Sequence, residues 1–146
     1  MSFLTKICRS ALVCYSQRQM FDLVHDVEKY SEFLPWCAAA EILSEFEDSV
    51  EARIDIAFKN LEQSFSTRNS IRRYDRIDMQ LVDGPFKHLR GTWSFTGLSE
   101  KQSKVEFFMD FEFKSVLLGK LAGSTFEKIA GNMVDAFAKR AADIYG

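Results

Sequence analysis

Apolar and polar side chains alternate, segment after segment, through the middle of this chain, and this alternation most limits the folds it can adopt. In the clearest segment, every second residue from Val105 to Phe113 is apolar, and three of the four residues between them are acidic: Glu106, Asp110 and Glu112. Such alternation indicates a strand with one buried and one wet face. Weaker copies cover residues 52–58, 65–72, 77–81 and 89–95. Short connections then predict an antiparallel meander; one of them is the Asp83-Gly84-Pro85 turn.

The N-terminal part predicts one strand followed by two short helices. Residues 3–14 alternate imperfectly and indicate the first strand. Ser16 and Gln19 then have the spacing of a capping box, which marks a helix start. Apolar residues over 20–27 follow helical spacing, and a second short helical turn ends at Pro35.

After Lys114 the apolar period changes from two residues to that of a helix. Ser124 and Glu127 form a second capping-box pattern, so we expect a long helix to begin there. At about 20 residues it would be roughly 30 Å long. Gly119 and Gly123 precede it, in a predicted loop or irregular helix. One stripe of this helix is apolar: Phe126, Ile129, Ala130, Met133, Phe137, Ala141 and Ile144.

The order of elements predicts an α+β helix-grip fold with a curved antiparallel sheet of about seven strands. A strongly curved sheet has a concave face that needs a cover. The terminal helix is the one predicted element long enough to lie across that face. The length of 146 residues fits one domain, which we expect to span residues 1–146.

Charge and cysteine content narrow the class of protein. The formal net charge is -2, so no global basic field draws the chain to nucleic acid or anionic membrane. Cys8, Cys14 and Cys37 have no metal-ligand spacing, and we expect buried thiols in a reducing compartment. We find no transmembrane run, and Lys6 and Arg9 interrupt any signal sequence. These features predict a bacterial cytoplasmic protein without a metal or covalent cofactor.

The aromatic content gives the apolar interior two interpretations. With 14 Phe, 4 Tyr and 2 Trp, the chain can fill a large core, or it can line a tunnel for a flexible apolar ligand. Pro35, Trp36 and Phe86 are candidates for a gate. The full set of candidate tunnel residues is Phe33, Pro35, Trp36, Phe65, Phe86, Leu89, Trp93, Phe107, Phe111, Phe113, Phe126, Met133 and Phe137.

Charged and titratable residues offer fewer candidates. Arg68, Arg72 and Arg90 fall on the wet faces of neighbouring predicted strands. They form either a solvated face or a local patch that contacts RNA phosphates. His25 and His88 are expected to be ordinary surface residues, because no nucleophile, acid or metal ligand is spaced to work with them. We therefore predict no catalytic residues.

Several stretches resemble a known family over nearly the whole chain. They are MFDLV (20–24), DVEKY (26–30), FLPWC (33–37), FSTR (65–68), DGPFKHL (83–89), DFEF (110–113) and MVDAF (133–137). Together they resemble the coenzyme-Q-binding START-like family of the polyketide cyclase/START superfamily, including its bacterial ribosome-association toxin branch. FLPWC and DGPFK are the more specific stretches. Ser31 departs from the pattern, since the family usually has Pro there.

The resemblance implies a START-like fold and a function in binding. Mitochondrial members bind ubiquinone and support respiration, bacterial members are described as toxins of the large ribosomal subunit, and the family has no accepted catalytic residues. We thus expect a non-enzymatic protein that binds ubiquinone or a related polyprenyl lipid, in part peripheral to the inner membrane. The alternatives are a translation inhibitor on the large ribosomal subunit, with an antitoxin partner, and a cyclase-like enzyme.

Overall fold

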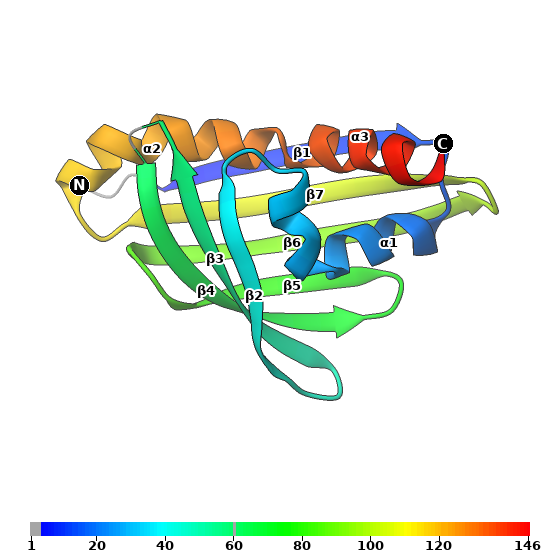
Figure 1. Cartoon of the computed structure of the whole chain (residues 1–146), viewed down its shortest axis with the longest axis horizontal. Coiled ribbons are helices and arrows are strands. Elements are labelled where there is room, and N and C mark those ends of the chain that lie inside the picture. Colours follow the sequence, from blue (N-terminus) through cyan, green and yellow to red (C-terminus); the bar gives the residue numbers. More distant parts are fainter. Residues whose placement is uncertain (1–3, 60) are drawn as a thin grey trace.

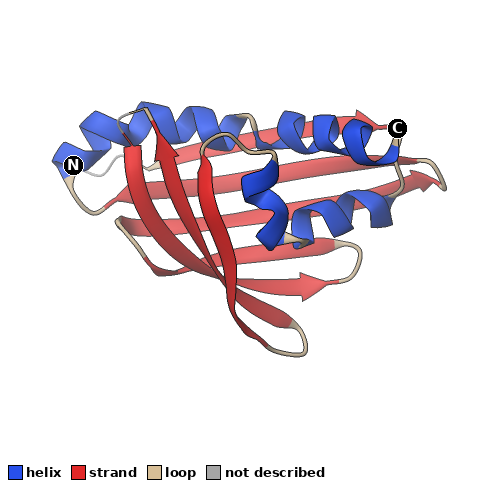
Figure 2. Ribbon diagram, in the orientation of Figure 1, coloured by secondary structure: helices blue, strands red, loops and turns tan. Residues whose placement is uncertain are grey.

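A seven-stranded antiparallel sheet curves around helices that pack on its concave face (Figures 1 and 2). The computed structural model describes residues 4–59 and 61–146. The elements are β1 (Thr5–Val13), α1 (Gln17–His25), the 3₁₀ helix η1 (Val27–Glu32), β2 (Cys37–Glu45), β3 (Ser49–Phe58), β4 (Leu61–Arg72), β5 (Arg76–Asp83), β6 (Phe86–Ser99), β7 (Gln102–Phe113), α2 (Val116–Gly131) and α3 (Met133–Tyr145).

The strand order is β1-β7-β6-β5-β4-β3-β2. Strands β2 to β7 form a meander in which each strand pairs with the next, and β1 returns to the far edge beside β7. Helices α2 and α3 run end to end along β1 and β7, α1 lies beside α3 over β6 and β7, and η1 packs on β2 (Figure 1). The predicted α+β helix-grip fold is confirmed.

The predicted alternation sets the two faces of the sheet. On β7, the odd-numbered residues from Ser103 to Phe113 are buried against the helices. Phe107 lies opposite Trp93 of β6, and both side chains are 1% exposed. The even-numbered residues of β7 point to the outer, convex face. This one-sided burial is what an antiparallel sheet with one wet face requires.

The start of α1 follows the capping-box prediction. The Gln19 backbone N–H donates to Ser16 Oγ at 3.1 Å, and the Ser16 N–H donates to Gln19 Oε1 at 2.9 Å. The second short helix is the 3₁₀ helix Val27–Glu32. It ends before Pro35, earlier than predicted, and the Leu34 N–H still donates to Tyr30 O at 2.9 Å.

The C-terminal helix begins eight residues before its predicted start, at Val116 rather than at Ser124. Ser115 is the actual N-cap, because its Oγ accepts the Leu118 N–H at 3.1 Å. Ser124 lies within α2, where the preceding turn already supplies backbone acceptors, so its capping-box pattern has no orphan donor to satisfy. Gly119 and Gly123, predicted as loop, are helical.

The predicted single long helix is two helices that meet at Asn132. The Asn132 backbone has φ −100° and ψ 0°, and its N–H donates to Lys128 O at 3.1 Å and Ile129 O at 3.3 Å. The apolar stripe changes at this break. Val134 is buried, whereas Ile144, predicted to lie in the stripe, is 51% exposed. Among the described residues, none of the helices is both long and apolar enough to span a bilayer.

Candidate functional site

A cavity of about 60 Å³ lies between the concave face of the sheet and α2. Its walls come from the sheet strands β3 to β7, from η1, from Trp36, from the C-terminal half of α2 and from the first residue of α3. The lining residues are Val27, Tyr30, Trp36, Ala52, Ile54, Ile56, Phe65, Thr67, Asn69, Met79, Leu89, Trp93, Phe107, Met109, Phe126, Ile129, Ala130 and Met133. The surface they form is mostly apolar and aromatic, as in sites for small apolar ligands.

One row of residues across four strands makes part of the cavity floor. Asn69 of β4 lies opposite Met79 of β5, Met79 opposite Gly91 of β6, and Gly91 opposite Met109 of β7. Gly91 has no side chain, and a Cβ atom there would lie 2.7 Å from Met79 Cε and 3.2 Å from Phe108 O. The two thioether chains fill this space and are flexible. The floor can therefore change shape at little cost.

Polar side chains interrupt the apolar lining at one place. Thr67 and Asn69 are 5% and 6% exposed, and Thr67 Oγ1 donates to Asn69 Oδ1 at 2.8 Å. The Tyr30 hydroxyl, also at the cavity, donates to Val24 O. Burial raises the pKa of Tyr30, so its phenol stays neutral. The cavity thus holds neutral polar groups of the kind that orient a ligand without a charge.

The structure separates the predicted tunnel residues into two groups. Those that border the cavity are Trp36, Phe65, Leu89, Trp93, Phe107, Phe126 and Met133. Phe86, Phe111 and Phe113 instead surround Phe126, with ring centroids 5.0, 4.7 and 6.0 Å away. Phe33 and Phe137 pack on each other at 5.2 Å, and Pro35 is exposed.

Sequence patterns did not single out the polar pair Thr67 and Asn69 or the methionines of the floor as site residues. The usable signal for Thr67 and Asn69 was their place on the inward face of β4, in step with Phe65. Polar residues at inward positions are exceptions that call for an explanation. Met79 and Met109 gave no signal beyond ordinary core alternation.

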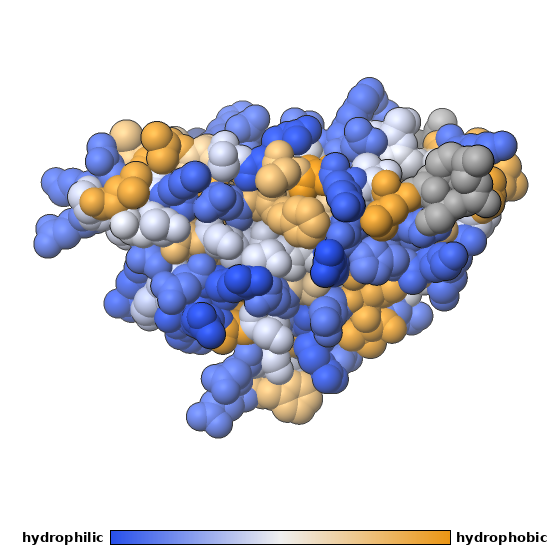
Figure 3. Space-filling view, turned by 180° about the vertical axis from the view of Figure 1, so that it is seen from behind, coloured by the Kyte–Doolittle hydropathy of each residue, from blue (hydrophilic) through white to orange (hydrophobic). Residues whose placement is uncertain are grey.

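The convex face carries a row of charged and polar residues, all but one of which are at least partly exposed. The cross-strand register aligns Lys6, Asp110, Arg90, Gln80, Arg68 and Glu51. Arg68 pairs with Glu51 at 3.4 Å, and Arg72, on the same strand and face, is exposed. Seen from that side, the molecule is mostly hydrophilic over the sheet (Figure 3). The predicted basic patch is therefore interleaved with carboxylates.

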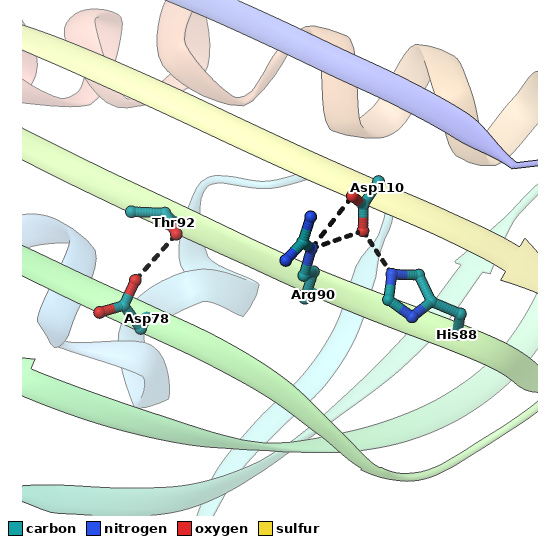
Figure 4. A network of polar contacts seen from close by, with 5 residues as sticks. All are labelled: Asp78, His88, Arg90, Thr92 and Asp110. Carbon is teal, nitrogen blue, oxygen red and sulfur yellow. Dashed lines mark hydrogen bonds and ion pairs between the residues drawn. The ribbon is translucent and has the colours of Figure 1, made fainter.

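Asp110 is the buried centre of this face. Its side chain is 2% exposed and is contacted by His88 and by Arg90 Nε, which lies 3.2 and 3.1 Å from the two carboxylate oxygens (Figure 4). Burial opposes its ionisation, but the hydrogen bonds from His88 and Arg90 and the charge of Arg90 outweigh burial and lower the pKa of Asp110. Beside this cluster, Thr92 donates to Asp78 at 2.8 Å.

The other titratable residues that the sequence singled out are His25 and the three cysteines. His25 stacks on Phe21 at 5.5 Å, and burial is the main cause that lowers its pKa. Cys37 is buried, and its thiol pKa is raised to about 11, chiefly by burial. Cys8 and Cys14 are exposed, so the prediction of three buried thiols is wrong for them, because their positions on β1 and after it face outward. Within residues 4–59 and 61–146, no cluster of His, Cys, Asp and Glu could hold a metal ion.

The N-terminal half of α2 exposes an apolar ridge. Val116, Leu117 and Leu121 are 60%, 66% and 68% exposed. Lys114 and Lys120 flank them, and the segment from 114 to 126 contains no acidic residue. The same helix contributes Phe126, Ile129 and Ala130 to the cavity wall, so the ridge and the cavity share one element.

Comparisons with known proteins agree with this architecture. The chain is 43% identical over 140 residues to the ribosome association toxin RatA of Escherichia coli (strain K12), covering 96% of this chain and 89% of that protein. It is 33% identical over 141 residues to the mitochondrial coenzyme Q-binding protein COQ10 homolog B of Xenopus laevis, covering 94% of this chain and 58% of that protein.

Among solved structures, the Zhui aromatase/cyclase from Streptomyces sp. R1128 matches with a TM-score of 0.82 at 15% identity, covering 99% of both chains. That similarity shows the shared fold. A family model described as polyketide cyclase / dehydrase and lipid transport matches residues 13–138. The model covers most of the chain, and the curved sheet packs around α2 and α3. This chain therefore belongs to the polyketide cyclase / dehydrase and lipid transport family, whose fold is START-like.

Proposed function

We propose that this protein binds an apolar ligand of isoprenoid character, with ubiquinone as the leading candidate, and that it does so without catalysis. The observation that carries the proposal is the cavity between the concave sheet and α2, with its adaptable floor of Met79, Gly91 and Met109. The relative named as a coenzyme Q-binding protein and the lipid transport in the family description support it. A cyclase-like activity has weaker support, since the similarity to a cyclase is one of fold.

The ligand has to widen the cavity. A volume of about 60 Å³ is far below that of typical ligand pockets, roughly 300–1,000 Å³. Met79, Met109 and Met133 line it and have several rotatable bonds, so they can turn aside. A ligand burying about 500 Å² of apolar surface gains about 12 kcal/mol before costs. Association and ordering remove at least about 4 kcal/mol, which still leaves room for micromolar binding.

The apolar ridge on α2 provides a route for such a ligand. An isoprenoid resides in a membrane, and the ridge of Val116, Leu117 and Leu121, with Lys114 and Lys120 beside it, suits the surface of an anionic bilayer. We therefore propose that the protein is cytoplasmic and docks peripherally on the membrane through α2. Because α2 also forms a cavity wall, docking would place the cavity near the lipid.

Lipid extraction of the purified protein tests the proposal. We expect mass spectrometry of the organic extract to find a quinone or another polyprenyl lipid, and titration with quinone to load the emptied protein. Ala130 is 2% exposed at the cavity wall, so Ala130→Leu should exclude the lipid. Ala142→Leu, the same change at an exposed position of α3, should keep it. Extracts that hold only buffer components, with no quinone uptake, would contradict the proposal.

A second function, association with the large ribosomal subunit, is favoured by the outer face. Arg68 and Arg72 lie on the same exposed face of β4, and the relative from Escherichia coli is named a ribosome association toxin. Arg90 lies two strands away in the same row as Arg68. Since carboxylates pair with Arg68 and Arg90, RNA phosphates would have to replace these partners. The cavity and this face are on opposite sides of the sheet, so both functions can coexist.

Co-sedimentation with large ribosomal subunits tests this second function. We expect binding that weakens as salt rises and that falls at least about tenfold in the triple variant Arg68→Glu, Arg72→Glu, Arg90→Glu. Arg18→Glu, an exposed arginine on α1, is the control and should bind like the parent protein. Equal sedimentation of both variants, or none by the parent, would refute it. An antitoxin partner remains a prediction from the sequence.

A further inference from the structure

We propose that Thr67 and Asn69 form a head-group site that hydrogen-bonds an acceptor oxygen, such as the ring carbonyl of a quinone, within the otherwise apolar cavity. The inference rests on the proposed binding function and adds to it the chemistry by which one class of apolar ligand is preferred. The site would take an apolar chain that ends in a neutral carbonyl group. A hydrocarbon of the same shape would lack the interaction.

The burial of the pair is the first argument. Both residues are about nineteen-twentieths buried, at 5% and 6% exposure, and they line the cavity. No fully buried side-chain nitrogen or oxygen among the described residues lacks a hydrogen-bond partner, so an amide nitrogen without a partner is not fully enclosed. The hydrogen bond seen here uses the Thr67 hydroxyl and Asn69 Oδ1. It leaves the two N–H groups of the Asn69 amide to donate to a further acceptor at the cavity.

The donor is present in either orientation of the amide. If the Asn69 nitrogen instead donated to Thr67 Oγ1, the Thr67 hydroxyl would become the available donor. Thr67 and Asn69 are neutral, so the site favours a neutral acceptor over an ion. A buried carboxylate or ammonium ligand would lack a charged partner among the residues that line the cavity.

The neighbours of the pair place the head group at a defined depth. Asn69 lies next to Met79 in the register, and Met79 lies next to Gly91, where the floor has no side chain. A flat ring can lie over Gly91 once the methionines turn aside, and its carbonyl can then reach the Asn69 amide. Asn69 also borders a smaller adjoining void with His25 and Trp93. The apolar tail would extend the other way, toward Trp36 and α2.

The direct test compares an alkyl-1,4-benzoquinone with the alkylbenzene that carries the same tail. We expect the parent protein to bind the quinone about tenfold more tightly than the hydrocarbon, the gain from one buried hydrogen bond. Asn69→Leu and Thr67→Val keep the approximate shape but remove donors. Each should weaken quinone binding toward that of the alkylbenzene while alkylbenzene binding holds or improves.

Ser66→Ala is the matched control. Ser66 is buried on the same strand, at 8% exposure, but lies opposite Asp83 and Arg53 on the other face of the sheet. We expect it to keep the full preference for the quinone. An independent readout is the infrared carbonyl stretch of the quinone bound to the parent protein, which should move to lower frequency than in an alkane. This measurement needs no variant to fold.

The outcomes separate the two proposals. If the parent protein binds quinone and alkylbenzene equally, or if folded Asn69→Leu and Thr67→Val keep the preference, the head-group site is wrong and the apolar cavity stands. An unshifted carbonyl stretch would also overturn the head-group site. If the parent binds neither probe, the proposed binding function fails and the head-group site fails with it.

Discussion

At the scale of single residues, Asp110 is the one charged residue that is buried among those the structure describes. It is held on the convex face by His88 and Arg90, both from β6, and its side chain is 2% exposed. A buried carboxylate stripped of its partners would be costly. The His88–Asp110–Arg90 cluster therefore stabilises the β6–β7 pairing at the edge of the proposed RNA-facing row, and it is a structural feature in our account.

Replacement of Asp110 should reveal this stability and its pH dependence. Its folded-state pKa lies below the unfolded one, so ionised Asp110 stabilises the fold above the unfolded pKa of about 4. That stability is lost as pH falls through the folded-state value. We expect Asp110→Asn to cost about 1–3 kcal/mol in urea unfolding at neutral pH and clearly less near pH 3.

Asp78→Asn provides the comparison. Asp78 is 42% exposed and pairs with Arg76 at 2.9 Å, and exposed pairs contribute about 0–1 kcal/mol. At neutral pH, Asp78→Asn should therefore lower the free energy of unfolding by less than Asp110→Asn does. Equal losses for the two variants, or a loss at Asp110 that does not depend on pH, would contradict the account.

At the scale of elements, α2 joins three features: the core, the cavity and the exposed ridge. Phe126 anchors its inner face, with ring contacts to Phe65, Phe86, Phe111 and Phe113 at centroid distances of 4.7–6.2 Å. Its outer face presents Leu117 and Leu121 to solvent. One helix therefore has both a firmly packed face and an apolar face that the described residues leave exposed.

Substitutions on the two faces of α2 should differ sharply in their effect on stability. Phe126 is 3% exposed, and we expect Phe126→Ala to lower the free energy of unfolding by about 3–5 kcal/mol. Leu121 is 68% exposed, and Leu121→Ala should change it by no more than about 0.5 kcal/mol. Urea denaturation measures both. Similar losses would mean that the ridge is part of the packed core.

The apolar ridge should instead contribute to the binding of the protein to membranes. We expect the double variant Leu117→Glu, Leu121→Glu to lose most binding to vesicles that contain anionic phospholipid, measured by flotation, because it removes apolar contact and adds repulsion. Ile144→Glu introduces the same charge at another exposed apolar position and should float like the parent. Vesicle binding unaffected by the double variant would exclude α2 as the docking element.

Some of these elements could be predicted from sequence patterns and others could not. Strand alternation predicted the sheet, because a strand that is buried on one face has an apolar residue at every second position, as from Val105 to Phe113. The start of α2 was missed because Leu117 and Leu121 face solvent, so the first turns have no one-sided apolar stripe. The helix breaks at Asn132, directly after Gly131, and this Gly-Asn pair lies inside a continuous apolar stripe that favoured one long helix.

At the scale of the whole molecule, the proposed ligand binding depends on a cavity that few sequence signals could locate. Alternation indicates which residues point inward, such as Phe65 and Phe113. The alternation does not show which of these side chains lines the cavity. Phe65 does, whereas Phe113 stacks on Phe86 with ring centroids 4.8 Å apart. That difference depends on strand curvature and on where α2 crosses the sheet. The resemblance to a family implied that the chain binds a ligand. The row Asn69-Met79-Gly91-Met109 now provides specific candidate residues for contact with that ligand.

The two tryptophans offer the most direct test of ligand binding in this cavity, because Trp36 and Trp93 both line it. In the Trp36→Phe variant, Trp93 is the sole tryptophan, and it is 1% exposed in the parent structure, so a quencher in water cannot reach it. Titration with a short-chain ubiquinone analogue should quench the fluorescence of Trp93 along a saturable curve, and additional Ala130→Leu should abolish this quenching. Quenching that is absent, or that rises linearly and equally with and without Ala130→Leu, would contradict the claim that the protein holds a quinone-like ligand between its sheet and α2.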